Sequence, residues 1–152
     1  MNERVPRRGV DGTIIEWLDV PARAVELHLE PHPEGGWYRR TWASAATVDA
    51  HGGTRPAATM ILFLLPPGES SAWHVVTSDE LWLWHGPGAV RIQHGGAAPA
   101  PDAGETCVLD AANPQVLVPA GNWQRTLPAE TETLVSCVVS PGFSFDDFTL
   151  AD

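Results

Sequence analysis

The sequence predicts a mainly β domain, an antiparallel sandwich or barrel with one short helix near its N-terminus. About ten short runs of apolar and β-branched residues follow one another at close spacing, and turn-forming segments separate them. This alternation is typical of antiparallel sandwiches and barrels. Gly and Pro contribute 14 residues each to a chain of 152, which suits turn-rich β structure better than a helical bundle.

The one helix is expected over Thr13–Val20. Asp11 or Thr13 can cap its first turn, and Pro21 directly after it would end it. The charged segment that precedes it, residues 1–12, is expected to be an N-terminal tail without a secretory signal.

After this helix the chain contains only short β-type runs and no internal repeat. Turn signals such as PPGES at 66–70 and PAGN at 119–122 separate the runs. Since one domain commonly takes roughly 150 residues, residues 13–152 are expected to form a single domain. The expected strands are Val25–Leu29, Trp37–Trp42, Thr59–Leu65, Ser71–Val76, Leu81–Trp84, Ala89–Gln93, Thr106–Leu109, Gln115–Val118, Gly121–Leu127, Thr133–Val139 and Phe145–Leu150.

Charge and composition exclude several classes of protein. Nine basic residues, all Arg, stand against 19 acidic ones, and the net charge of −10 argues against a nucleic-acid partner. The absence of Lys excludes Schiff-base chemistry and a P-loop. The longest apolar run, Met60–Leu65, is too short to cross a membrane, and Cys107 and Cys137 are expected to be reduced thiols. We therefore expect a cytoplasmic protein.

Two stretches contain the residues most suited to chemistry. In the first, the turn at 77–79 would place His74 and Glu80 on neighbouring strands near the end of a hairpin. In the second, an apolar strand leads into a Pro-x-Gly turn and then to Gln124.

These stretches resemble the two sequence motifs of the cupin superfamily. More closely, the chain is similar to its DUF985 branch, through PHPEGG, the Trp-His-x-x-x-Ser-Asp-Glu segment, Val-Pro-x-Gly-x-Trp-Gln and a closing Ser-Pro-Gly-Phe-x-Phe-x-Asp-Phe. The resemblance covers about residues 13–150 and implies a double-stranded β-helix, the jelly-roll cupin barrel, that is usually a homodimer. The motif positions that match are Gly68, His74, Glu80, Gly86, Pro119 and Gly121, whereas Val76 and Gln124 stand where the motifs have His, and Asn113 stands for a Gly.

The two missing histidines bear on metal binding. A catalytic zinc takes three protein ligands, and non-haem iron takes two His and a carboxylate. Only His74 and Glu80 remain here, so no cofactor is expected. His85 cannot complete the set, because it lies five positions after Glu80 and points to the other face of the strand. The alternative is a dioxygenase-like cupin that holds a weakly bound divalent metal through His74, Glu80 and Gln124.

Without a metal, His74 beside Glu80 becomes a candidate for acid–base catalysis. Tyr38, the only Tyr, offers a phenolic acid, and sugar-nucleotide epimerases of the cupin superfamily pair a His base with a Tyr. If the protein is an enzyme, these residues best fit a metal-independent isomerase, epimerase or lyase that acts by proton transfer at His74, with Glu80 and Tyr38 as further catalytic residues. The alternative is a binding module without catalysis, in which His74 and Glu80 form a structural pair.

The ligand is expected to be a small organic molecule, polar or acidic, held in the mouth of the barrel. Trp82 and Trp84 share the strand parity of Glu80, and Arg39 could pair with an acidic group. The expected substrate-binding residues are therefore Trp82, Trp84, Gln124 and Arg39. The remaining histidines lie in turn-rich or terminal contexts and are expected at the surface, namely His28, His32, His51 and His94.

Overall fold

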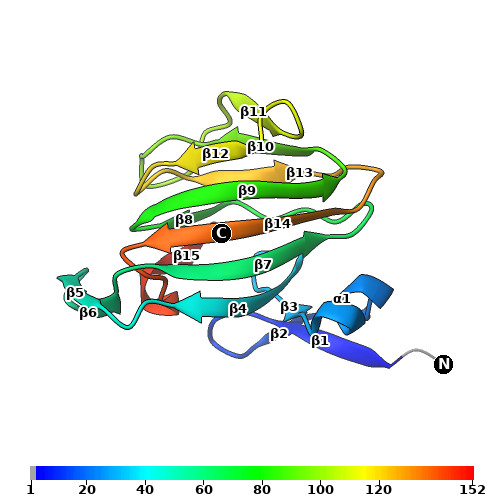
Figure 1. Ribbon diagram of the computed structural model, residues 1–152, viewed down its shortest axis with the longest axis horizontal. Coiled ribbons are helices and arrows are strands. Elements are labelled where there is room, and N and C mark those ends of the chain that lie inside the picture. Colours follow the sequence, from blue (N-terminus) through cyan, green and yellow to red (C-terminus); the bar gives the residue numbers. More distant parts are fainter. Residues whose placement is uncertain (1–2) are drawn as a thin grey trace.

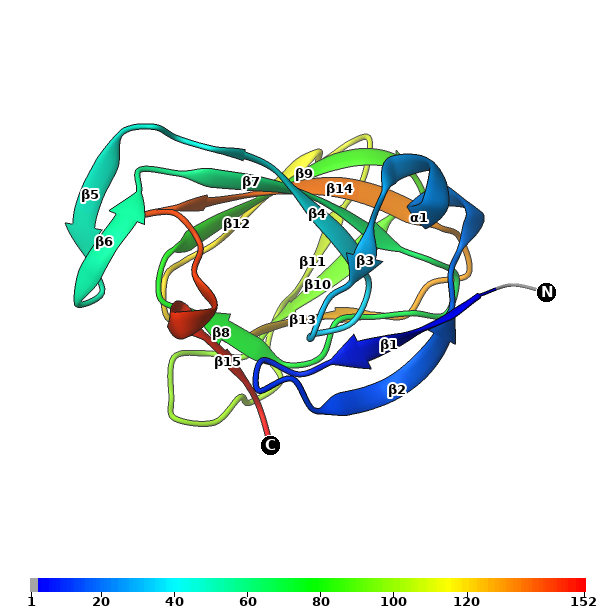
Figure 2. The same cartoon turned by 90° about the horizontal axis from the view of Figure 1, so that it is seen from below.

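Two antiparallel β-sheets lie face to face in the computed structural model, which describes residues 3–152 (Figures 1 and 2). A short helix and two hairpins lie at the margins of this sandwich. The predicted jelly-roll arrangement with a short helix near the N-terminus is thereby confirmed.

The larger sheet has six strands and the smaller has five. In spatial order the larger sheet contains β12 (Gln115–Val118), β9 (Asp79–Pro87), β14 (Thr133–Ser140), β7 (Thr59–Leu65), β4 (Trp37–Ala43) and β3 (Glu30–Pro31). The smaller contains β11 (Thr106–Leu109), β10 (Val90–His94), β13 (Gln124–Leu127), β8 (His74–Val76) and β15 (Phe148–Leu150). The other elements are the hairpin of β1 (Arg4–Arg8) and β2 (Ile14–Asp19), the hairpin of β5 (Thr47–Ala50) and β6 (Gly53–Pro56), helix α1 (Ala22–Leu27) and the 3₁₀ turn η1 (Phe145–Asp147).

The main core fills the space between the two sheets. It contains alternate residues of each strand, because successive side chains of a strand point to opposite faces. On β9, Glu80 and Trp82 point inward, and Cys137 of β14 lies opposite Trp82 in the pairing register. Phe63 of β7 packs edge to face on Trp82, with ring centroids 5.8 Å apart. The strand parity that fixes this core also turns Glu80 into the sandwich.

The position of the helix differs from the prediction. Residues 14–19 form strand β2, whose Ile14, Ile15 and Trp17 are residue types that favour strands. Pro21 begins a helix instead of ending one, and α1 ends at His28 in the left-handed conformation, with φ of 58°. The expected strand at Val25–Leu29 is therefore replaced mostly by the helix. No helix within residues 3–152 is long and apolar enough to span a membrane.

A row of apolar side chains crosses the outer face of the larger sheet. The pairing register places its members opposite one another from β12 to β4. Three of the five are largely exposed, with exposed fractions of 41 to 49% for Leu81, Trp42 and Leu117. We call this set the outer row; it comprises Leu117, Leu81, Val138, Met60 and Trp42.

The segment expected to be a tail includes β1, whose Arg7 is buried. The Arg7 guanidinium donates hydrogen bonds to the backbone carbonyls of His32 (2.6 Å) and Gly36 (2.8 Å). It also pairs with Glu16 of β2 and with Glu69, each at 3.0 Å. Arg7 therefore fastens the hairpin to the turn at residues 32–36.

Removing this guanidinium is expected to destabilise the protein strongly. The change Arg7→Ala removes the charged donor that two carbonyls and Glu69 share, each of which keeps one other donor. Breaking such a buried network costs about 3–5 kcal/mol. Urea unfolding followed by fluorescence measures the change. The control is Arg4→Ala on the same strand, because Arg4 is exposed and its pair with Asp19 is long at 3.8 Å. An equal loss of stability in both variants would contradict this account.

Candidate active site

A cavity of about 380 Å³ opens between the sheets near β3, β4 and the C-terminal segment. Its wall combines apolar side chains with several titratable ones, an arrangement typical of ligand sites. The polar residues around it are Glu30, His32, Glu34, Tyr38, Arg40, Thr59, Glu80, Cys137 and Ser144.

The turn that carries Glu34 into the cavity requires glycine at two positions. Gly35 and Gly36 have φ of +115° and +71°, values that side chains other than hydrogen rarely permit. A Cβ on Gly36 would lie 2.6 Å from the Phe63 ring, and one on Gly35 would collide with the Ser70 carbonyl. The turn therefore lies directly against the core, which explains why a carboxyl on a loop can be almost buried.

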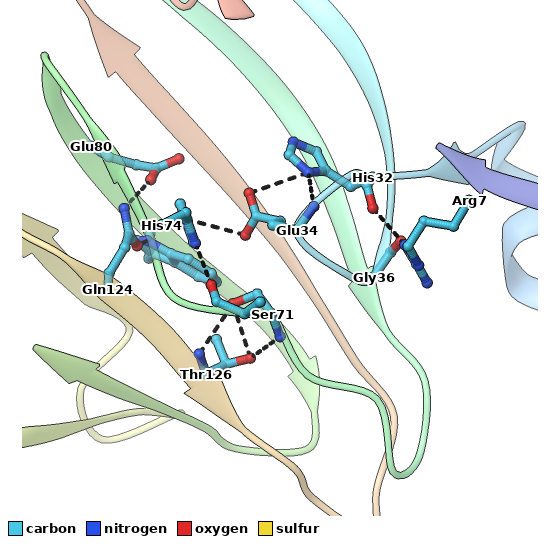
Figure 3. Close-up of polar contacts among 11 residues, drawn as sticks. Arg7, His32, Glu34, Gly36, Ser71, His74, Glu80, Gln124 and Thr126 are labelled. Atoms are coloured by element: carbon cyan, nitrogen blue, oxygen red, sulfur yellow. Dashed lines mark hydrogen bonds and ion pairs between the residues drawn. The ribbon is translucent and has the colours of Figure 1, made fainter. Parts of the chain in front are cut away.

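Glu34 connects two histidines that come from different parts of the chain (Figure 3). Its Oε2 lies 3.3 Å from Nε2 of His74, and its Oε1 lies 3.3 Å from Nδ1 of His32. His74, at the start of β8, is 1% exposed and lies behind Glu34, outside the lining of the cavity. The expected catalytic His74 therefore faces the cavity only through Glu34.

The proton between Glu34 and His74 belongs to the carboxyl. Nδ1 of His74 lies 2.7 Å from the Ala72 carbonyl, which only accepts, so Nδ1 carries the ring proton. Burial lowers the pKa of His74 to about 4, so the ring is neutral near pH 7 and its Nε2 can only accept. Burial, with the nearby Glu80 carboxyl, raises the pKa of Glu34 well above its usual value. The pair is thus a neutral carboxylic acid that donates to imidazole.

Glu80 is held by a chain of hydrogen bonds across the core. The indole Nε1–H of Trp82 donates to the amide oxygen of Gln124 at 3.0 Å. Because indole only donates, this bond fixes the amide so that its nitrogen donates to Oε1 of Glu80 at 2.7 Å. Gln124 and Trp82 therefore orient Glu80 and do not line the cavity.

Glu80 gains or loses its proton near neutral pH. Burial raises its pKa to about 7, while the hydrogen bond from Gln124 opposes the rise. A carboxyl with this pKa exchanges protons readily at physiological pH. The cavity thus contains two carboxyls, Glu34 held protonated and Glu80 close to its titration point.

The other predicted site residues are spread more widely. Tyr38 lines the cavity, and burial raises the pKa of its phenol, so it stays a hydrogen-bond donor. Trp84 packs against the core and donates to the Gly88 carbonyl. Arg39 lies outside the cavity and donates to Leu27, whereas its neighbour Arg40 lines the cavity. The structure therefore brings together Glu80 and Tyr38 around the cavity, with Gln124 and His74 behind.

Sequence reasoning missed Glu34 and placed His32 at the surface. His32 is in fact 3% exposed, because the Arg7 guanidinium and four aromatic rings enclose its turn. The PHPEGG segment at 31–36 is the one sequence feature that could have indicated this part of the site. A Gly pair marks a place where the backbone passes close to other atoms.

The motif positions do not fit a metal ion. Both ends of the Gln124 amide are engaged, and the two ring nitrogens of His74 face Ala72 and Glu34. His85 points to the opposite face, as expected, where it meets Ser136 at 2.6 Å. Over residues 3–152, no three His, Cys, Asp or Glu side chains are arranged to hold a metal.

The sheets and the enclosed cavity define a double-stranded β-helix protein. The profile of the Cupin superfamily (DUF985) matches residues 23–151, so the chain belongs to this family and has its small-molecule-binding fold. No curated protein matches the chain.

Several solved structures resemble the chain. A hypothetical protein from Leishmania major is 31% identical over 86% of each chain, with a TM-score of 0.74. A protein from Shewanella oneidensis is 37% identical, with a TM-score of 0.73, over 84% of this chain and 81% of that one. An uncharacterised double-stranded β-helix protein from Klebsiella pneumoniae shares the fold at 16% identity, with a TM-score of 0.59, over 84% of this chain and 94% of that one.

The raised pKa of Glu80 predicts a pH-dependent gain from Glu80→Gln. Between pH 4.5 and about 7 the folded state binds a proton that the unfolded state releases, so this residue lowers stability as pH rises. Gln keeps an acceptor for Gln124 and has no such proton. Relative to the natural protein, the variant should therefore gain about 3 kcal/mol of unfolding free energy across this interval.

Chemical denaturation at a series of pH values measures the difference in unfolding free energy between the variant and the natural protein. Because both proteins contain the same histidines, the contributions of the histidines to the pH dependence cancel in this difference. The control is Glu130→Gln, the same substitution at an exposed residue outside the cavity. A flat difference for Glu80→Gln would show that Glu80 titrates normally.

Proposed function

We propose that the protein is a metal-independent enzyme that acts by proton transfer on a small polar molecule bound in the cavity. Isomerisation, epimerisation and elimination all belong to this class. The observation that carries the proposal is that the Glu34 carboxyl, backed by His74, faces the same cavity as Glu80. Two carboxyls in different protonation states can supply an acid and a base.

The two carboxyls have different roles in this proposal. Glu80, whose pKa of about 7 leaves about half of it ionised at neutral pH, removes a proton. Glu34 supplies a proton. Before the ligand binds, His74 is a positioning residue that accepts a hydrogen bond from this proton, and the proton turns from His74 to the ligand during the reaction. Tyr38 adds a neutral donor, and Arg40 at the rim can pair with an acidic group of the ligand.

Solvent deuterium exchange tests the proposal directly. Small metabolites that bind the protein are first found by ligand-observed NMR, and their C–H signals are then followed in D₂O. We expect one class of ligand to lose a C–H signal with enzyme that has been treated with EDTA. The rate should rise with pH through about 7, as Glu80 ionises, and Glu80→Gln should lower it by about a hundredfold or more.

The control is again Glu130→Gln. Glu130 lies outside the cavity, so this variant should exchange the C–H protons of the ligand at the rate of the natural protein. Exchange that requires an added divalent metal would favour the dioxygenase-like alternative. Ligands that bind in the cavity without any exchange would favour the binding module.

We also propose a homodimer formed through the outer row. The row forms a continuous apolar strip across five strands. Helix α1 does not cover it, because α1 packs on a different cluster that includes Trp37 and Leu64. A second copy of the same flat strip is its natural complement in a two-fold interface. A cytoplasmic location is proposed with it, supported by the unpaired thiols of Cys107 and Cys137.

Light scattering at micromolar concentration is expected to give twice the chain mass of 16.4 kDa. The double variant Leu81→Glu/Leu117→Glu places two like charges directly opposite each other in the row and should give the mass of one chain. Val108→Glu, an exposed apolar site on the other sheet, is the control and should stay dimeric. A single-chain mass for the natural protein would overturn the homodimer.

A further inference from the structure

The His32 ring is fixed in one tautomer by its own turn. The backbone N–H of Glu34 donates to Nδ1 of His32 at 3.1 Å, so Nδ1 carries no proton. Burial, together with the nearby His74 and Arg7, lowers the pKa of His32 well below its usual value. The ring is therefore neutral at neutral pH and its single proton lies on Nε2.

This Nε2–H has no hydrogen-bond partner among residues 3–152. The ring is 3% exposed and lines the cavity, and its Nε2 is accessible from that space, so only what occupies the cavity can accept from it. Tyr38 packs edge-on against the ring at 4.5 Å, and Phe63, Phe145 and Phe148 surround it at 5.7 to 5.9 Å. Four aromatic neighbours thus hold one donor in a fixed direction toward the cavity, where a ligand that displaces water can accept from it.

The donor lies close to the two carboxyls. Figure 3 shows the side chains of Glu80 and His32 on either side of Glu34. All three residues line the cavity, and Glu34 touches His32 directly. A ligand in this space would meet a base, an acid and a neutral N–H donor together.

We propose that Nε2–H of His32 binds the carbonyl oxygen of the substrate, and that the substrate is a carbonyl compound whose reacting end is uncharged and has a C–H bond next to the carbonyl. This inference rests on the proposed proton-transfer function and specifies its substrate class. A neutral imidazole donor suits an oxygen that becomes negative during the reaction, because it stabilises that charge without having to be deprotonated first.

The proton transfers balance without any further reactant. The Glu80 carboxylate takes the proton from the carbon next to the carbonyl, the C–H electron pair forms a C=C bond, and the carbonyl π pair moves to the oxygen. His32 Nε2–H stabilises this enolate oxygen. Glu34 then gives its proton to carbon or oxygen, and Glu80 returns its proton through solvent to Glu34. The product is an isomer of the substrate.

The charged groups around the cavity favour a substrate whose reacting end is uncharged. Glu34 and Glu80 flank the donor, and the only guanidinium on the cavity wall, that of Arg40, is exposed and donates to the Phe143 carbonyl. A carboxylate or phosphate beside Glu80 would meet a like charge with only neutral donors to compensate it. An acidic group can therefore be accommodated only at the rim, away from His32.

Two substitutions separate the two nitrogens of His32. Asn places an oxygen where Nδ1 accepts from Glu34, so His32→Asn keeps the turn and removes the cavity donor. Gln reaches further and presents an amide N–H near the position of Nε2, so His32→Gln should restore part of the donation. His28→Asn is the control, because Asn tolerates the left-handed conformation of that exposed residue.

The tautomer is measured first, by two-bond proton–nitrogen NMR of protein labelled with ¹⁵N-histidine, with His32→Asn to assign the signals. We expect His32 to carry its proton on Nε2 and His74 on Nδ1. The labelled protein is then titrated with three open-chain ketones (hydroxyacetone, dihydroxyacetone and L-erythrulose) and with the alcohols that match them (propane-1,2-diol, glycerol and erythritol). The ketones should shift the Nε2–H signal of His32 downfield, and the alcohols should not.

Exchange of the protons next to the carbonyl in D₂O then supplies the kinetic test. His32→Asn should lower the rate by about a hundredfold, the usual effect of losing one donor to a developing oxyanion, and His32→Gln should recover part of it. A large loss with Glu80→Gln and none with His32→Asn overturns this inference and leaves the proposed function intact. No loss with either variant overturns both. A proton on Nδ1 of His32, or a His32 signal that no ketone shifts, also overturns the inference.

Discussion

The guanidinium of Arg7 lies buried between the β1–β2 hairpin and the turn at residues 32–36, where it binds acceptors from three separate parts of the chain. A charge in this position is tolerable only because two carboxylates and two carbonyls surround it. The carbonyls belong to His32 and Gly36, at the two ends of the turn that carries Glu34. The direction of Glu34, and hence its contact with His74, depends on this one buried cation.

The protonation states of the site follow from its burial. A carboxyl between two imidazoles would form ion pairs in water, but burial disfavours every charged form and leaves a neutral acid beside two neutral rings. Each proton then has a fixed place, since Ala72 fixes one ring and the Glu34 amide fixes the other. The cavity wall therefore presents defined donors and acceptors with little reorganisation required, which is the condition for electrostatic catalysis.

Much of the fold was predictable from the sequence, but the site was less so. Thr59–Leu65, Thr106–Leu109 and Gln115–Val118 form strands with the predicted bounds, because period-two alternation and turn residues are local signals. Glu34 and His32 were missed as site residues, since their burial comes from Arg7 and from rings distant in sequence. The misplaced helix has another origin: Ile14, Ile15 and Trp17 favour a strand, and β1 pairs with β2 in a hairpin. Contacts between distant segments decide only the burial of Glu34 and His32.

The amide of Gln124 has a consequence for how this protein could change over generations. It occupies the place of a metal-binding His in the related motif, yet it is joined to Trp82 on one side and to Glu80 on the other. Histidine at that position would complete, with His74 and Glu80, the set of two histidines and a carboxylate that non-haem iron takes. An imidazole that ligates a metal can no longer accept from the Trp82 indole and donate to Glu80 at the same time. A single substitution would thus exchange the hydrogen bonds that orient Glu80 for a metal ligand.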